Sequence, residues 1–287
     1  MVAAPTKELV AWIWGKLHDD FEMTDLDLLT SFLGLEIETN RNQGTLHLSQ
    51  KRYIEKILVQ HGLQCCNPAL TPADAHVRLE KSYPEFEALP ESKRKYQSAV
   101  GSLMYAMLGS RPDIAYAVGK VSQYSTNPDI THFMAVKRIF RYLAGTRDRG
   151  LCYGTQGSGY GFTDADWGGS DDRRSIGGYT FLLNGAAICW NSKKQKTVAL
   201  SSTEAEYMAL TQGVKESLWL QAILKDLGAR KHIEEMRNIN VDNQGALALA
   251  HNPQFHSRTK HIDIQYHFIH QQKNCPAPCC ILFAPSA

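Results

Sequence analysis

The sequence lacks several features that would assign it to a class at once. No stretch approaches the ~18 consecutive apolar residues that suggest a membrane span, and the N-terminal apolar run is too short for a signal peptide. The formal net charge is only +2, so no general positive field points to nucleic acid. Seven scattered cysteines include no CxxC pair, which disfavours a disulfide framework. We expect an intracellular protein that is neither secreted nor membrane-bound.

Residues 1–147 form the first of two predicted domains, of the α+β class. The segment 31–50, SFLGLEIETNRNQGTLHLSQ, alternates apolar and polar residues on both sides of a turn, which predicts a β-hairpin. Residues 64–92, rich in Pro, Ala and charge, are typical of a surface connection. Helical apolar spacing occurs in four ranges: 51–62, 98–109, 113–125 and 130–145.

Residues 148–287 form the second predicted domain, of the α/β class. Four short aromatic and β-branched runs separated by Gly or Asn-Gly predict a strand meander: GLCYGT, GYGFTDAD, GGYTFLLNG and AAICWNSK. A capping sequence at 201–203 then starts a long helix that ends near Gly228. A strand at 237–242 and further helical segments follow. The order predicts a mixed sheet with helices on its faces.

Acidic residues stand at the ends of two predicted strands. Asp164 and Asp166 are two apart, so their side chains point to the same face of a strand, with no Lys or Arg adjacent. Asp242 ends the strand 237–242. Ligands gather at the carboxyl ends of strands in open α/β sheets, so these acids could face one site. Asp242 could also cap the helix that begins after it, and the two roles do not exclude each other.

A third acid comes from the long helix. Glu206 shares a helical row with Leu210, Gly213, Ser217 and Leu220, which predicts that it faces the sheet. Glu204 falls in a different row, predicted to be more solvated. Glu206 could also be a boundary residue that extends to solvent. Three converging carboxylates would repel one another, and hard divalent cations such as Mg²⁺ would compensate for this. Two such ions about 3.5–4 Å apart can hydrolyse a phosphodiester.

The acids lie in strings that match a known family. The sequence GFTDADWGG…RRSIGGYTFLLNGAAICWNSKKQKTVALSSTEAEYMAL…VDNQGALALA…RTKHIDIQYHFI closely resembles the ribonuclease H domain of copia-type LTR-retrotransposon polyproteins. Upstream, SFLGLEI…GTLHLSQKRYIEKIL and YQSAVGSLMYAMLGSRPDIAYAVG resemble the end of their reverse transcriptase and its link to ribonuclease H. The resemblance covers about residues 20 to 272.

The resemblance implies a ribonuclease H-like fold with a mixed five-stranded sheet and flanking helices. It implies hydrolysis of the RNA strand of an RNA–DNA hybrid with two Mg²⁺ or Mn²⁺ ions, held by Asp164, Glu206 and Asp242 as the catalytic residues. Other parts of the polyprotein become expected partners, and a cytoplasmic particle or the nucleus becomes the expected location. Asp166 is the alternative if Asp164 is not the ligand.

Two weaker predictions concern substrate contacts. Five basic side chains in loops flanking the meander could contact phosphates, or could be plain solvated surface. They are Arg173, Arg174, Lys193, Lys194 and Lys196. His256 could shuttle protons near the metals, or could be a surface histidine.

The sequence departs from the family pattern twice. It contains no polymerase palm with paired aspartates, so we do not expect a competent reverse transcriptase. It also stops after ILFAPSA, before the helix that in the family carries a fourth acid. In the family the string HIDIQYH belongs to the preceding helix, so we do not expect Asp263 to be a substitute. We therefore expect weakened hydrolysis. The alternatives are a nucleic-acid-binding remnant without activity and a decayed reading frame without a role.

Overall fold

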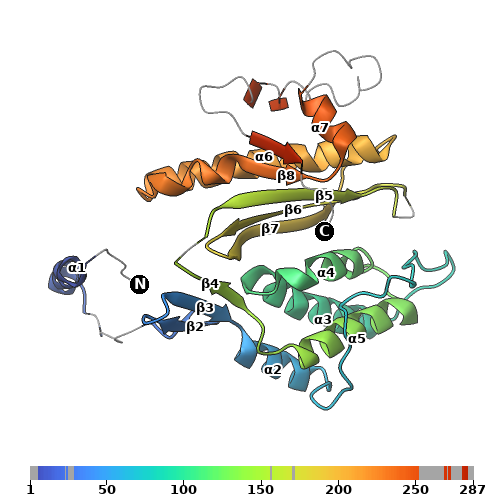
Figure 1. Ribbon diagram of the computed structural model, residues 1–287. Coiled ribbons are helices and arrows are strands. Elements are labelled where there is room, and N and C mark those ends of the chain that lie inside the picture. The colour runs from blue at the N-terminus through green and yellow to red at the C-terminus, as the bar shows by residue number, and fades with distance from the viewer. Residues whose placement is uncertain are drawn as a thin grey trace.

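A computed structural model describes residues 6–22, 24, 29–155, 157–169, 172–251, 268–269, 271–272 and 280–283. Two β-sheets and two main groups of helices account for most of these residues (Figure 1). The mixed α/β class predicted from the sequence is confirmed. No helix in the described part of the chain is long and apolar enough to cross a membrane.

The first sheet contains the predicted hairpin. Its strands are β1 (Ser31–Phe32), β2 (Leu35–Asn40), β3 (Thr45–Ser49) and β4 (Leu151–Tyr153), in the order β1-β2-β3-β4. β2 and β3 pair in antiparallel register from Glu36↔Ser49 to Asn40↔Thr45, as the alternating pattern predicts. Gly44 has φ +63 in the connecting turn, a conformation that favours glycine.

Helices beside this sheet bury a core of their own. They are α2 (Lys51–Gln60), α3 (Pro90–Gly109), α4 (Ala115–Ser122) and α5 (Ile130–Gly145), with a 3-10 turn at Pro112–Ile114. All four contribute fully buried apolar side chains, including Ile54, Leu103, Val118 and Leu143. A further helix, α1 (Lys7–Asp20), was not predicted and contains no buried residue.

Strand β4 differs from its predicted placement. The sequence assigns residues 151–153 to the meander of the second domain, whereas the structure pairs them with β3 of the first sheet, from Leu46↔Tyr153 to Leu48↔Leu151. A three-residue strand carries too little pattern to specify its partner. The predicted boundary between residues 147 and 148 stays a prediction.

The second sheet has the order β7-β6-β5-β8-β9. Its strands are β5 (Tyr160–Asp166), β6 (Ile176–Leu183), β7 (Ala186–Lys194), β8 (Asn238–Val241) and β9 (Cys280–Phe283). β5, β6 and β7 form the antiparallel meander, and β8 runs parallel to both β5 and β9. Crossing from β7 to β8 requires a long connection, and α6 (Ser202–Asp226) supplies most of it.

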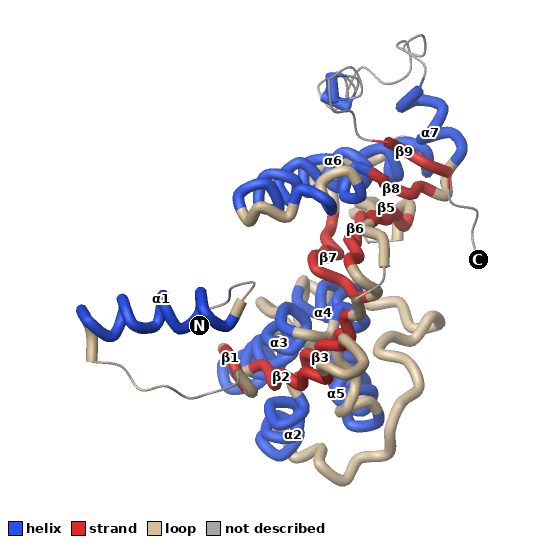
Figure 2. The backbone as a smooth tube through the Cα atoms, turned by 60° about the vertical axis from the view of Figure 1, so that its left-hand side comes forward, coloured by secondary structure: helices blue, strands red, loops and turns tan. Residues whose placement is uncertain are grey.

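Helices lie on both faces of this sheet. Figure 1 shows α6 along one face and the α3–α5 group on the opposite side, and Figure 2 shows the same arrangement from another direction. α7 (Gln244–His251) follows β8 and packs on α6. Tyr207, Leu210 and Val214 of α6 are buried with Ile239 and Val241 of β8 in one apolar core. This core fixes α6 relative to the strand ends that carry the acids.

Candidate metal centre

Asp164 and Asp242 lie side by side at one edge of the sheet. β5 and β8 are parallel, and their last paired residues are Thr163 and Val241. The next residue along each strand is one of the two aspartates. Because the strands run in the same direction, their carboxyl ends place both side chains at the same edge. The sequence argument for adjacent strand-end acids is therefore confirmed in geometry.

Glu206 reaches the same edge from the first turns of α6. The Ser201 hydroxyl accepts a hydrogen bond from the Glu204 backbone N–H at 3.2 Å and caps this helix. About two turns after Glu206, a Cβ placed on Gly213 would lie 2.4 Å from Cγ2 of Thr163. The absence of a side chain at Gly213 lets α6 lie close to β5. This close approach brings Glu206 within reach of the strand ends.

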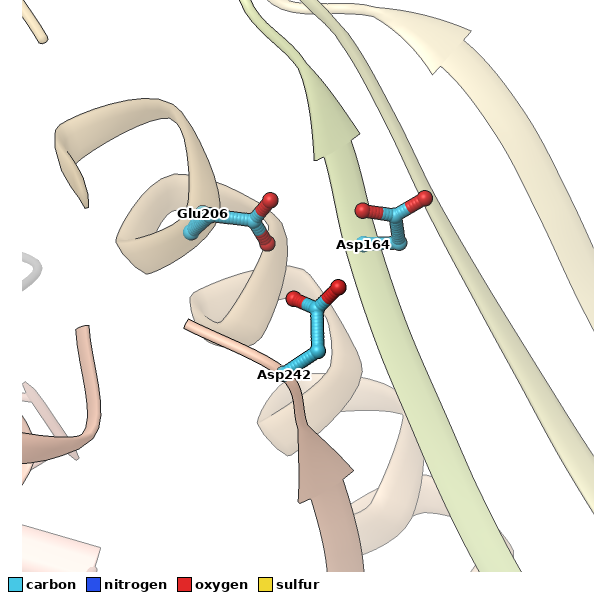
Figure 3. Close-up of side chains that lie close together, drawn as sticks. All are labelled: Asp164, Glu206 and Asp242. Carbon is cyan, nitrogen blue, oxygen red and sulfur yellow. The ribbon is translucent and has the colours of Figure 1, made fainter. Parts of the chain in front are cut away.

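The three carboxylates converge (Figure 3). One oxygen of each of Asp164, Glu206 and Asp242 lies within 4.8 Å of the others. Glu206 is 6% exposed, while both aspartates are open to solvent. An arrangement with one buried and two accessible carboxylates leaves a face through which a phosphate could approach.

Electrostatics at this cluster disfavour three ionised acids in the absence of a cation. Burial raises the pKa of the Glu206 carboxyl to about 8, and the nearby charge of Asp164, followed by that of Asp242, adds to the effect. A hydrogen bond from the Ala165 backbone N–H acts in the opposite direction. Oε2 of Glu206 is buried and has no hydrogen-bond partner among the described residues. A cation would both balance the charge and satisfy this oxygen.

Two sequence alternatives for these acids are resolved by the hydrogen bonds. The helix cap before α7 is Asn243, whose Oδ1 accepts from the Ala246 backbone N–H at 2.9 Å, so the capping role suggested for Asp242 is wrong. The prediction that Glu204 lies in a solvated row is also wrong. Glu204 is 4% exposed, and its Oε2 accepts from Leu200 N at 2.7 Å. The physical reason is that the loop before α6 covers this side of the helix: Leu200 contacts Glu204, and the Thr197 hydroxyl lies 3.8 Å from Sδ of Met208, one turn further along.

Asp166 does not join the cluster. Its Oδ1 accepts a hydrogen bond from the Ile176 backbone N–H at 3.0 Å, across the β5–β6 ladder. The two aspartates of the sequence Asp164-Ala165-Asp166 thus have different partners. Asp164 meets Glu206 and Asp242, and Asp166 is directed to the start of β6.

The five basic residues predicted to contact phosphates do not all lie in loops, and two of them lie near an acidic side chain. Lys193 and Lys194 are the last residues of β7, which corrects their placement in a loop. Lys194 Nζ lies 2.9 Å from an Asp172 oxygen and 3.0 Å from Gln123 Oε1. Arg174 is also near Asp172, at 3.8 Å. Arg173 and Lys196 are exposed loop residues, as expected. His256 lies outside the described residues.

One residue near the site was missed by the sequence reasoning. The Gln195 side chain donates from Nε2 to the Ala205 backbone carbonyl at 2.8 Å, next to Glu206. Its Oε1 is buried without a partner among the described residues. A single glutamine after a strand gives no periodic signal, so only the folded loop shows that it holds the first turn of α6.

Several known proteins similar to this chain are transposon proteins. The chain is 44% identical over 278 residues to the retrovirus-related Pol polyprotein from transposon TNT 1-94 of Nicotiana tabacum, which covers 94% of this chain. It is 35% identical over 223 residues to a putative transposon Ty5-1 protein of Saccharomyces cerevisiae, covering 75% of this chain and 70% of that protein. The chain belongs to the copia-type retrotransposon Pol polyproteins.

The resemblance drawn from the sequence motifs is thereby confirmed. This copia-type chain spans only 21% of the length of the tobacco polyprotein. It is also 52% identical over 128 residues to the secreted RxLR effector protein 161 of Plasmopara viticola, covering 44% of this chain and 90% of that protein. No family model and no solved structure matches the chain.

Proposed function

We propose that this copia-type chain is a ribonuclease H-like nuclease that hydrolyses the RNA strand of an RNA–DNA hybrid. The observation that carries the proposal is the convergence of Asp164, Glu206 and Asp242 from two parallel strand ends and one helix. The sheet order β7-β6-β5-β8-β9, with α6 between β7 and β8, supports the ribonuclease H-like fold.

The donor set suits Mg²⁺ or Mn²⁺. All three ligands are carboxylate oxygens, which hard cations prefer. Oε2 of Glu206, which has no hydrogen-bond partner among the described residues, adds a buried acceptor. When bound, two such ions would activate a water and stabilise the leaving oxygen of the phosphodiester. The aspartates would hold the ions from the open side, while the Ala165 N–H and the packing of α6 orient Glu206 from the buried side.

The test is cleavage of an end-labelled RNA–DNA hybrid by the full chain in Mg²⁺. Asp164→Asn should lower the rate by about 100-fold or more, because it removes a ligand charge. Asp226→Asn, which removes an exposed carboxylate at the far end of α6, should leave the rate unchanged.

Three outcomes would contradict the proposal. Cleavage that survives Asp164→Asn unchanged would refute the site. A larger loss in Asp166→Asn than in Asp164→Asn would move the site to the other aspartate. Hybrid binding without cleavage, even at high Mn²⁺, would favour the alternative of a nucleic-acid-binding remnant.

A further inference from the structure

A cavity of about 980 Å³ is lined at one edge by Asp166, two residues after Asp164. Its walls come from α4, α5, the connecting segment 72–79 and the end of β5 with the glycines after it. We refer to this cavity as the α4–α5 groove. Asp166, at its edge, follows Asp164 by two residues on the same face of β5, a rise of about 6.7 Å along the strand. The edge of the groove is therefore two residues along β5 from the proposed nuclease site.

The floor of the groove exposes apolar side chains. Ile130 is 72% exposed, Met134 60% and Tyr116 43%. Lys120 Nζ lies 5.7 Å from the centroid of the Tyr116 ring and donates to the Gly169 carbonyl at 3.0 Å. An aromatic ring with a cation beside it can stack on a base while the cation lies near a phosphate.

The charge of the groove favours a polyanion. Among its described lining residues, four side chains are cationic and two are carboxylates, which leaves an excess of two positive charges. The cations are Arg78, Lys120, Arg138 and Arg141, and the acids are Asp74 and Asp166. Arg138 is paired with Asp74 at 2.9 Å, and Arg78 lies 3.6 Å from Glu80, which is outside the lining. Lys120 makes its contact to a neutral carbonyl. The lining of the groove thus has more cationic than acidic side chains, with Asp166 at its edge.

We propose that the α4–α5 groove binds a single strand of nucleic acid that continues from the phosphodiester held at the carboxylate cluster. Bases lie on Tyr116 and Met134, and Lys120 neutralises a phosphate. The nature of this ligand rests on the proposed nuclease function. The short separation from the cluster along β5 and the positive excess of the lining favour nucleic acid over a peptide, for which apolar lining residues alone would suffice.

The experiment compares two probes on the full chain, with Ca²⁺ in place of Mg²⁺ and the integrity of the probe checked on a gel. One probe is a blunt fluorescent RNA–DNA hybrid, and the other is the same hybrid with a single-stranded tail on either strand. Fluorescence anisotropy gives the dissociation constants. We expect the tail to tighten binding roughly tenfold, the gain of about one stacked base.

Variants of single groove residues test whether this gain in affinity comes from the groove. Tyr116→Ala should remove most of the tail-dependent gain, while Tyr83→Ala, at a tyrosine that is 82% exposed outside the groove, should keep it. Lys120→Gln should lower the slope of log affinity against log salt by about one, as for one lost phosphate contact. Lys231→Gln, at an exposed lysine beyond the end of α6, should not.

Two results would overturn the proposal that the groove binds a single strand. The first is a tail that gains nothing in the unmodified chain, which would leave a protein-docking surface as the better interpretation. The second is an equal loss of the tail-dependent gain in affinity in Tyr116→Ala and in Tyr83→Ala. Hydrolysis in Mg²⁺ is measured separately. Lost tail binding with intact hydrolysis refutes only the groove, and absent hydrolysis with intact tail binding refutes only the nuclease.

Discussion

Glu206 is the residue at which function and stability conflict. It is buried, lies beside two aspartates and has one oxygen without a partner among the described residues. A carboxylate in such a place destabilises the metal-free fold when it ionises. The same features would make it a strong ligand once a cation is present. Its helical row predicted that it faces the sheet, but only the fold shows which charges surround it.

The first prediction concerns pH. The folded pKa of Glu206, about 8, lies above its ordinary value of 4.5, so the folded chain holds a proton that the unfolded chain releases between these values. The contribution of this group to the free energy of unfolding is therefore fully present below about pH 4.5 and is lost as the pH rises through about 8. In EDTA, Glu206→Gln should flatten this fall in melting temperature, whereas Asp226→Asn should keep it. An unchanged slope in Glu206→Gln would contradict the prediction.

The second prediction concerns metal. Mg²⁺ that binds only the folded chain should raise its stability by about 2.7 kcal/mol at 100 times the dissociation constant. EDTA should reverse the shift, and Asp242→Asn should reduce it because one ligand charge is gone. Melting curves measured with and without Mg²⁺ at pH 8 test this. Equal shifts in the unmodified chain and in Asp242→Asn would exclude Asp242 as a ligand.

At the scale of elements, α6 determines whether the site forms. The helix was predicted from its capping sequence and its apolar spacing, and the structure confirms both. Its solvated side was predicted wrongly, because helical spacing describes a helix against one neighbour, whereas α6 packs against the sheet, α7 and a loop. Strand β4 shows the same difficulty, since three residues cannot indicate which of two sheets they join.

The third prediction uses two helical glycines. In Gly213→Ala the new Cβ would lie 2.4 Å from Thr163 Cγ2, so α6 must move from β5, at a cost of about 1–3 kcal/mol. Gly101→Ala, in α3, meets nothing within 4 Å and should stabilise by up to about 1 kcal/mol. Urea unfolding measures both. The prediction fails if both variants shift stability in the same direction.

At the scale of the whole molecule, side-chain contacts join the helices of the first part to the second sheet. The Trp190 indole N–H of β7 donates to the Met107 carbonyl at 3.1 Å, and Lys194 reaches Gln123 of the segment after α4. Met107 lies in the last turn of α3, where helix carbonyls lack partners within the helix. A side chain of the second sheet therefore supplies a hydrogen-bond donor to the C-terminal turn of α3.

The fourth prediction tests this contact. Trp190→Phe removes the indole donor but keeps an aromatic ring, and should lower the free energy of unfolding by about 1 kcal/mol. Trp219→Phe, at an indole that is 54% exposed on α6, should change it by less than about 0.5 kcal/mol. Equal effects in chemical denaturation would show that the contact contributes nothing.

The sequence by itself determined the family, the hairpin, the long capped helix and the three acids. Each of these depends on local spacing or on strings of adjacent residues, which can be recognised without knowing the fold. Only the tertiary structure decided that Asn243 rather than Asp242 caps α7, that Asp166 has a different partner from Asp164, and that Glu204 is buried. It also decided that a groove with more cationic than acidic lining residues has Asp166 at its edge. These depend on which residues far apart in the chain come into contact, and periodicity within one element contains no information about its neighbours.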